Sequence, residues 1–472
     1  MRIKRLAAAL ALSASILPLA ASAEPAAPPL AEQKLAIDTQ YFTLPNGLRV
    51  VLAKDDIAPT VTVAVYYGIG FRIEPRDRTG FAHLFEHLMF QGSEHAPKGT
   101  LIGTISNNGG VLNGSTRFDY TNYFEVVPSN VLDRVLWLEA DRMANPVINE
   151  TVLKNQQGVV GNEVKVNVLN QPYGSWPWID LPMLANTNWY NSHNFYGDLS
   201  EIEAATVSDA KEFSHKFYVP SNAVLVIAGD IDYAEAKAKV QKYFGNIPKG
   251  PDVSKPDISE PRQTKEKTGS RVDKLAPKPG YSAGYHMPKR GTPEWYAMGL
   301  IDQMLVQGDD SRLYQKLVQD TGIAGNVSGG INAFLGNMYN YDGPMLWMFN
   351  FTHDADVSDA KITAAVDSVV NDLRTKPVSQ AELDRAKTKI RSSLYDTVGG
   401  GGRVGLVDLL AVYALFDNDP SKVNQIDQGF AAVTPALIQK TADEYLRPTN
   451  RSIFTIVPGG AKQPATAEGA GK

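Results

Sequence analysis

The sequence contains no cysteine in its 472 residues. Without thiols the chain can form neither disulfides nor a thiolate metal site, and a catalytic cysteine and a lipid-modified N-terminal cysteine are excluded as well. Stability must therefore come from buried apolar side chains. A chain of this length can supply that burial as two or more domains.

Long apolar runs and an excess of basic residues are also missing. The longest apolar run, residues 6–19, falls short of the roughly 20 residues that a membrane-spanning helix needs. The chain has 46 Lys and Arg against 51 Asp and Glu, for a formal net charge of −5. Nucleic-acid binding favours clustered basic residues. The composition therefore argues against a nucleic-acid partner.

The first 23 residues have the layout of a secretory signal peptide. Arg2, Lys4 and Arg5 precede the apolar run, and the small residues 21–23 form a cleavage site before Glu24. A membrane anchor is the alternative, but the apolar run is too short for one. We predict that residues 1–23 are removed and that the mature chain is periplasmic and soluble, without stable membrane insertion. Loss of three basic residues takes the net charge from −5 to −8.

A proline-rich stretch divides the remaining chain into halves of similar length. Residues 248–261 hold four prolines and no periodic pattern, which is typical of a linker. We predict an N-terminal domain over 40–247 and a C-terminal domain over 262–457. The small, polar tail 458–472 is predicted to be disordered.

The two halves open with the same order of predicted elements. In the first half, the β-branched runs at 48–56 and 60–72 predict adjacent strands, with a hairpin as one form of that pairing. A helix is expected over 131–146, ending before Pro146, and a buried strand over 222–232. The second half begins with a strand-like run to about Met287, followed by a helix over 295–305 that has no histidine.

The stretch "TGFAHLFEHLMFQGS", residues 79–93, combines a helical apolar stripe with two histidines. The stripe follows a spacing of i, i+3, i+4, i+7 and i+8 and consists of Phe81, Leu84, Phe85, Leu88 and Met89. On a helix, His83 and His87 lie only about 40° apart around the axis, on the side opposite the stripe. The stripe can pack into a core while both imidazoles face a cleft.

The same stretch predicts a zinc site with a general base. Imidazole nitrogen is a good zinc ligand, and catalytic zinc sites usually have three protein ligands and one open position for water. Glu86, directly before His87, can accept a proton from that water, whose pKa zinc lowers towards about 7. The alternative is a solvated helix face that happens to carry histidines. The ligand set would also accept manganese or cobalt.

H-x-x-E-H is the inverted zinc-peptidase motif, and the chain around it resembles the pitrilysin/insulinase family of zinc metallopeptidases. The similarity extends to the small bacterial members and to mitochondrial processing peptidase. It covers nearly the whole mature chain and includes "LPNGLRVVLA", "GFAHLFEHLMFQGS", "GGVLNGSTRFDYTNYFEVV", "FYVPSNAVLVIAGDID" and "GDDSRLYQKL".

The resemblance implies a third zinc ligand and a peptide-binding strand. In the family the third ligand is a glutamate on a separate helix, and Glu163 is the matching residue. A second family carboxylate, seven residues earlier, is Gln156 here, which could orient the ligands through a hydrogen bond without adding charge. The stretch 113–127 matches a strand that pairs with extended substrate by β-augmentation. Its expected contacts are Asn113, Gly114, Ser115 and Thr116; a plain sheet strand is the alternative.

The family's arginine–tyrosine pair, which binds substrate and stabilises an oxyanion, has no counterpart at the matching positions. These positions hold Val318 and Gly325. Arg312 and Tyr314 lie nearby but belong to the preceding helix. The resemblance therefore implies a homologous partner subunit that supplies the pair in a heterodimer. A shifted register, or activity without the pair, is the alternative.

The glycine-rich run 397–405 is predicted to be a flexible connection between helices; phosphate binding or gating is the alternative. The remaining histidines have no partners at metal-ligand spacing and are expected to be surface or core residues. They are His95, His193, His215, His286 and His353.

Together these features predict an α+β protein. Two homologous domains, each an antiparallel sheet packed with helices, would form half of a clam-shell peptidase. The expected function is an exported zinc endopeptidase that hydrolyses peptides or unfolded segments and binds one Zn²⁺ per chain. A non-catalytic zinc-binding scaffold or peptide-binding subunit of the same fold is the rival hypothesis, and another zinc hydrolase chemistry is a third. The cleavage specificity is not encoded in any motif.

Overall fold

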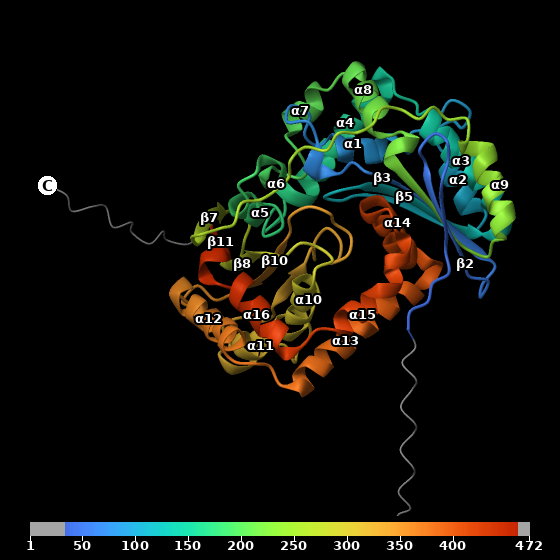
Figure 1. Ribbon diagram of the computed structural model, residues 1–472. Coiled ribbons are helices and arrows are strands. Elements are labelled where there is room, and N and C mark those ends of the chain that lie inside the picture. Colours follow the sequence, from blue (N-terminus) through green and yellow to red (C-terminus); the bar gives the residue numbers. More distant parts are fainter. Residues whose placement is uncertain (1–33, 461–472) are drawn as a thin grey trace, which may run out of the picture. The chain divides into compact units, whose positions relative to one another are not determined.

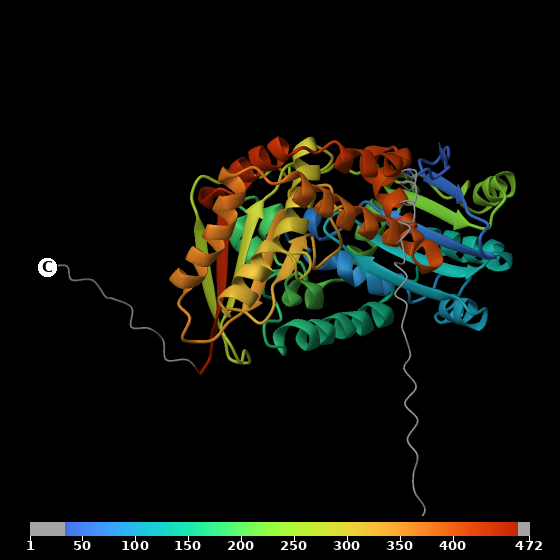
Figure 2. The same cartoon turned by 90° about the horizontal axis from the view of Figure 1, so that it is seen from below.

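The computed structural model describes residues 34–460. The predicted signal peptide and residues 461–472 of the predicted tail lie outside this range. Two sheets, one in each half of the chain, are packed with helices. Both views separate the blue-to-cyan strands of the first sheet from the yellow and red strands of the second (Figure 1 and Figure 2). This confirms the predicted α+β architecture.

The first sheet has the order β1-β2-β6-β3-β5-β4. The prediction that the strands near 48–56 and 60–72 are adjacent is wrong, because β6 lies between them. Every residue of β6 is buried, so this apolar strand occupies an interior position with neighbours on both sides. The strands are β1 (Gln40–Thr43), β2 (Arg49–Lys54), β3 (Thr60–Tyr67), β4 (Val111–Thr116), β5 (Thr121–Pro128) and β6 (Ala223–Gly229).

The second sheet has the order β7-β11-β8-β10-β9. Neither sheet is purely antiparallel as predicted, because β2 pairs with β6 and β7 pairs with β11 in parallel. Each of these pairs joins strands far apart in the sequence, so no hairpin turn fixes their direction. The strands are β7 (Lys267–Asp273), β8 (Gly280–His286), β9 (Ser328–Ile331), β10 (Leu346–Thr352) and β11 (Arg451–Pro458).

The helices predicted over 131–146 and 295–305 are confirmed as α3 and α10. The helices before the predicted linker are α1 (Phe81–Leu88), α2 (Thr100–Asn107), α3 (Leu132–Ala144), α4 (Glu150–Val164), α5 (Asp180–Ala185), α6 (Trp189–Ser192), α7 (Leu199–Ala204), α8 (Val207–Phe217) and α9 (Tyr233–Phe244). Those after it are α10 (Pro293–Leu305), α11 (Arg312–Tyr314), α12 (Asp359–Thr375), α13 (Gln380–Gly399), α14 (Val404–Asp417), α15 (Ile426–Ala431) and α16 (Pro435–Tyr445).

Each half of the chain contributes a helix to the sheet of the other half. Helix α5 packs on β7, β8 and β11, where Leu181 and Ala185 bury against Leu346 and Met348. In return, α14 packs on β2, β3 and β6 (Figure 1). Helix α14 is apolar around most of its circumference, so it needs a buried environment on more than one side. This exchange binds the two sheets into one body.

As predicted, the glycine-rich run connects two helices, α13 and α14. These helices are bent by 88° relative to each other. It also touches the first sheet. The Thr62 hydroxyl donates a hydrogen bond to the carbonyl oxygen of Gly402, and Arg403 forms an ion pair with Asp55 at 2.6 Å. The loop is therefore a contact between the halves as well as a connection.

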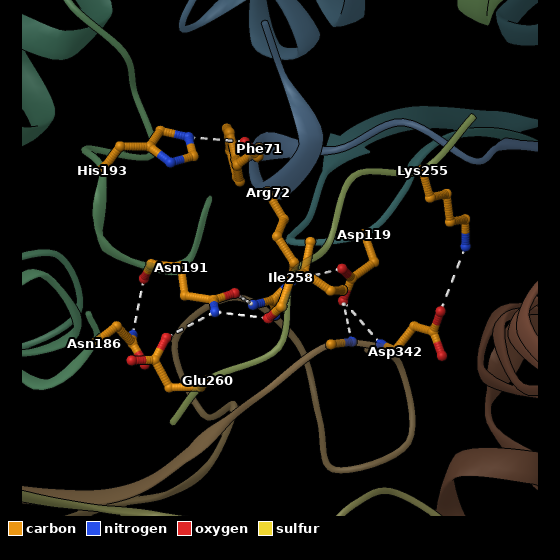
Figure 3. A network of polar contacts seen from close by, with 11 residues as sticks. Phe71, Arg72, Asp119, Asn186, Asn191, His193, Lys255, Ile258, Glu260 and Asp342 are labelled. Atoms are coloured by element: carbon orange, nitrogen blue, oxygen red, sulfur yellow. Dashed lines mark hydrogen bonds and ion pairs between the residues drawn. The ribbon is translucent and has the colours of Figure 1, made fainter. Parts of the chain in front are cut away.

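A buried polar network joins the first sheet to the predicted linker (Figure 3). Arg72 pairs with Asp119 at 2.6 Å and donates to Asn191 at 2.5 Å. The Asn191 amide donates in turn to Ile258 and Glu260, both at 2.9 Å. Residues 248–261 contain no helix or strand, yet these bonds fix part of the stretch. The domain boundaries themselves stay a prediction.

Within residues 34–460, no single helix is long and apolar enough to cross a membrane. The bent pair α13–α14 meets the length and composition criteria only when the two helices are taken together.

Candidate metal centre

Helix α1 presents the H-x-x-E-H motif from a firmly anchored position. Its apolar stripe is buried in the core, as predicted. Before the helix, Gly80 adopts a φ of +81°, and a side chain there would lie 2.7 Å from the Tyr196 carbonyl oxygen. The buried Glu74 carboxyl accepts hydrogen bonds from the backbone N–H groups of Gly80 and Ala82 at 2.9 and 2.6 Å. Glu74 therefore satisfies two donors that the helix cannot pair internally.

The structure brings His83, His87 and Glu163 together. The Nε2 atoms of the two histidines lie 3.3 Å apart. One Glu163 carboxylate oxygen lies 3.4 Å from His83 Nε2, and the other lies 3.2 Å from His87 Nε2. Glu163 reaches the histidines from α4, which packs against α1. Hydrogen bonds from both imidazoles hold the pKa of the Glu163 carboxyl well below its usual range.

The donor atoms fit a small tetrahedral cation. Nitrogen and oxygen ligands about 2.0–2.1 Å from Zn²⁺ at tetrahedral angles are about 3.3–3.4 Å from one another, close to the three separations seen here. Within residues 34–460 this trio is the one group of three or more His, Asp or Glu side chains whose donor atoms gather in this way. Two imidazoles and one carboxylate also leave the fourth position to water, as in a catalytic zinc site.

Glu86 lies between the two histidines in sequence and is held from the neighbouring strand. The Thr116 hydroxyl, on β4, donates to Glu86 Oε2 at 2.7 Å. The sequence predicts Thr116 as a peptide contact, whereas its buried side chain faces Glu86. No sequence pattern indicates this bond, because it depends on the alignment of β4 with α1. Thr116 bonds only one of the two Glu86 carboxylate oxygens, so Oε1 could still accept a hydrogen bond from water.

Among the strands of residues 34–460, β4 pairs with β5 alone and is therefore an edge of its sheet. An edge is what β-augmentation requires. The Asn113 side chain accepts from the Gly114 N–H at 2.9 Å, and the Ser115 hydroxyl donates to Asn122 at 2.5 Å. A Cβ at Gly114 would lie 3.1 Å from the Phe90 ring, so this position suits glycine. Peptide binding along β4 stays a prediction.

Tyr196, which sequence analysis did not single out, also borders the centre. Its ring meets the His83 ring edge to face, with centroids 5.0 Å apart. Burial, together with the negative charges of Glu163 and Glu86, raises the pKa of the Tyr196 hydroxyl to about 12. Tyr196 lies in the loop between α6 and α7, where no periodic pattern marks it. It fixes one face of the His83 imidazole.

The side chain of Gln156 is buried on α4, but its amide donates to Asn155 at 2.8 Å. Among residues 34–460 it has no hydrogen bond with the trio, so its ligand-orienting role stays a prediction.

The segment matched to the arginine–tyrosine pair offers no free donor at the matching positions. Val318 packs against the core, and Gly325 lies in an exposed loop. Arg312 is held by Glu382 at 2.8 Å and by Asp372 at 3.1 Å. Arg312 is therefore committed to helix packing, as its place in the preceding helix predicts.

The other histidines make local contacts. His95 pairs with Asp141 at 2.7 Å, which raises the pKa of the imidazole. His193 is buried between the carbonyl oxygens of Phe71 and Trp189 (Figure 3). His286 contacts the Ala185 carbonyl oxygen at 3.2 Å.

Two stretches of the chain match the sequence models of one peptidase family. Residues 49–173, which include the whole trio and Glu86, match the model described as insulinase (peptidase family M16). Residues 204–390 match the model described as the peptidase M16 inactive domain. The chain therefore belongs to peptidase family M16, the pitrilysin/insulinase family that its motifs indicate.

Three named proteins are similar to the chain over most of its length. Zinc protease PqqE of Helicobacter pylori is 25% identical over 426 residues, covering 89% of this chain and 93% of that protein. The probable mitochondrial-processing peptidase subunit beta of Arabidopsis thaliana is 24% identical over 434 residues, covering 90% and 79%. The crystal structure of the periplasmic protease PqqL from Escherichia coli has the same fold, with a TM-score of 0.71 and 18% identity, covering 90% of this chain and 48% of that one.

Proposed function

We propose that this chain is an exported, zinc-dependent endopeptidase that cleaves peptides or unfolded polypeptide segments. The observation that carries the proposal is the trio of donor atoms at 3.2–3.4 Å beside the base Glu86. The name of the relative PqqE, a zinc protease, supports the same activity. The signal peptide predicted for residues 1–23 and the name of the periplasmic protease PqqL support the location.

His83, His87 and Glu163 would hold one Zn²⁺. When bound, Zn²⁺ supplies Lewis acidity, which lowers the pKa of a water molecule and polarises a carbonyl group. Glu86 accepts the proton of the attacking water and passes it to the leaving amine. Thr116 orients Glu86 through its hydrogen bond. Strand β4, with Asn113, Gly114 and Ser115, aligns the extended peptide by main-chain pairing.

The chain is proposed to act as the catalytic subunit of a heterodimer. Val318 and Gly325 cannot donate side-chain hydrogen bonds, so a homologous partner subunit would supply the arginine and tyrosine. Two relatives support a paired arrangement. One is named as a subunit of a processing peptidase, and PqqL is about twice as long as the stretch that this chain matches.

A second candidate function is a zinc-binding scaffold or peptide-binding subunit without catalysis. The missing pair favours it, as does the match of residues 204–390 to a model described as an inactive domain. An intact base beside the trio favours the peptidase.

The decisive experiment measures cleavage of a quenched fluorescent peptide library by purified residues 24–472. The wild type and Glu86→Gln are each tested alone and with a co-exported homologue that carries the arginine–tyrosine pair. Cleavage only in the mixture, lost with Glu86→Gln, supports the heterodimeric peptidase. Cleavage by the chain alone contradicts the need for a partner. No cleavage in either case, with zinc still bound, favours the scaffold.

Metal binding is tested separately by zinc content after dialysis. We expect about one zinc per wild-type chain and strong loss in Glu163→Gln, because removing one of three protein ligands weakens the site. The matched control is Glu150→Gln, an exposed carboxylate at the start of the same helix. Equal zinc in Glu163→Gln and wild type would contradict the assignment of the third ligand.

A further inference from the structure

Arg117 directly follows the last residue of β4. Within residues 34–460 it forms no ion pair, and one nitrogen of its guanidinium, Nε, is shielded from solvent without a hydrogen-bond partner. The residue as a whole is half-buried. A buried N–H donor without a partner is costly, so this nitrogen is a candidate to bind an acceptor from outside the chain. The other buried arginine near this strand, Arg72, is paired with Asp119.

Arg117 belongs to the face of the first sheet opposite Glu86. Side chains alternate along a strand, and Thr116 faces Glu86 on α1. Ser115, on the other face, bonds Asn122 across the strand pair. Arg117 shares the parity of Ser115 and lies near Asp408 of α14, the helix packed on β2, β3 and β6. Glu86 and Asp408 therefore lie on opposite faces of the sheet, and Arg117 is on the face of Asp408.

Asp408 does not neutralise Arg117 by direct contact. Its carboxylate accepts hydrogen bonds from Tyr66 at 3.0 Å, Tyr120 at 2.9 Å and Asn340 at 3.1 Å. Burial raises the pKa of the Asp408 carboxyl, and these three bonds and the more distant charge of Arg117 oppose the rise. The guanidinium therefore keeps its donors free, and they lie at the end of the proposed peptide-binding edge.

A peptide paired with β4 would continue the alternation of the sheet. Some of its side chains would lie on the Glu86 face and their neighbours on the Arg117 face. Guanidinium donors suit a carboxylate, which they bind in a planar, two-bond geometry. We propose that Arg117 binds an acidic side chain of the substrate close to the cleaved bond, so that the enzyme favours acidic peptides. This inference rests on the proposed peptidase function.

The test compares matched peptides that carry Asp, Asn or Lys at each position flanking the cleaved bond. The full chain is used, with its partner if cleavage requires one. At one or more positions, wild type should prefer Asp by about tenfold in kcat/KM, as expected for a charge-assisted hydrogen bond. Arg117→Gln should bring that ratio close to one, and Arg117→Glu should favour Lys instead. The matched control is Arg134→Gln, an exposed arginine on α3.

Two results would overturn the inference. One is a wild-type enzyme without an Asp preference at any position. The other is an Arg117→Gln variant that cleaves Asp and Asn peptides more slowly by the same factor, which would indicate a contact with the partner subunit or a purely structural role.

A binding assay separates this inference from the proposed function. Fluorescein-labelled Asp and Asn peptides are titrated with Glu86→Gln, with and without Arg117→Gln, and followed by anisotropy. Tighter binding of Asp peptides that depends on Arg117 supports the inference, even if wild type cleaves nothing and the peptidase proposal fails. Cleavage without an Arg117-dependent preference in either assay rejects this inference and leaves the peptidase intact.

Discussion

At the scale of single residues, the hydrogen bond from Thr116 to Glu86 connects the proposed peptide-binding edge to the proposed base. The edge strand and the base are usually treated as separate parts of a peptidase, one for binding and one for chemistry. Here one residue of the strand determines how the base is oriented. A change in β4 can therefore affect the chemical step without altering the donor atoms of the trio.

Thr116→Val should lower kcat roughly tenfold, because a hydrogen bond to a charged group is lost while the side-chain volume is retained. Zinc content should not change, since Thr116 does not contact the trio. Steady-state kinetics and zinc analysis measure both quantities, with Thr104→Val on α2 as the matched control. An unchanged kcat would mean that Glu86 is oriented by other contacts.

The sequence alone predicts part of this site. The i, i+4 spacing gives His83 and His87, and Glu86 follows from its position between them. Glu163 is identified only by resemblance, because no local pattern distinguishes it from Glu150, the other carboxylate of α4. Tyr196 lies in an irregular loop and was missed, since its contact with His83 depends on how that loop packs.

At the scale of elements, α1 depends on a residue outside it. Glu74 occupies the place of an N-terminal cap, although it precedes the helix by several residues. Burial raises the pKa of the Glu74 carboxyl to about 8, from an ordinary value of 4.5. The folded state therefore favours the neutral carboxyl.

The sign of the pH effect follows from this difference. Between about pH 4.5 and 8 the folded state holds a proton that the unfolded state has lost, so the free energy of unfolding falls as the pH rises. In the Glu74→Gln variant this side chain cannot ionise, so its contribution to the free energy of unfolding does not fall as the pH rises. We expect it to be less stable by about 1–2 kcal/mol at pH 5, where one acceptor oxygen is missing. The deficit should shrink as the pH rises and change sign before pH 8, because the loss of one proton over three pH units lowers the stability of the wild type by about 4 kcal/mol.

Thermal unfolding of metal-free protein between pH 5 and 8 measures this trend. Glu150→Gln, whose carboxylate is exposed, should differ from wild type by a constant amount. If the stabilities of wild type and Glu74→Gln changed with pH by the same amount, the prediction would be contradicted.

The loop before α14 gives a test of the contact between the halves. Gly402 has a φ of +71°, and a Cβ there would lie 3.1 Å from the Val126 side chain. Gly402→Ala should therefore lower the free energy of unfolding by about 1–2 kcal/mol. Its neighbour Gly401 has open space and an ordinary φ, so Gly401→Ala should be nearly neutral. Denaturant melts compare the two, and equal effects would argue against a specific contact at Gly402.

Sequence patterns find most elements but not their partners. The burial of β6 follows from its apolar run, whereas its place between β2 and β3 depends on pairing over long sequence distances. Helix α14, which the sequence analysis did not single out, is apolar around most of its circumference. That it covers the sheet of the other half is not predictable, because an all-round apolar surface does not specify which sheet it meets.

At the scale of the whole molecule, the exchange of α5 and α14 predicts that the halves do not fold independently. A specific protease site inserted after Asp252, within the predicted linker, should yield a cut chain that still elutes as one species and melts in one transition. The isolated fragments should lack a cooperative transition, because each would expose the sheet face that the other covers. Two separate species after cleavage would contradict this view.

Because the two halves exchange helices, we expect the chain to move as one unit. The motion that admits a polypeptide to the proposed site would then take place where the chain meets the proposed partner. The time for which that contact stays open would set how quickly substrates enter and products leave. Turnover would accordingly be governed by the strength of an interface rather than by the mobility of a loop.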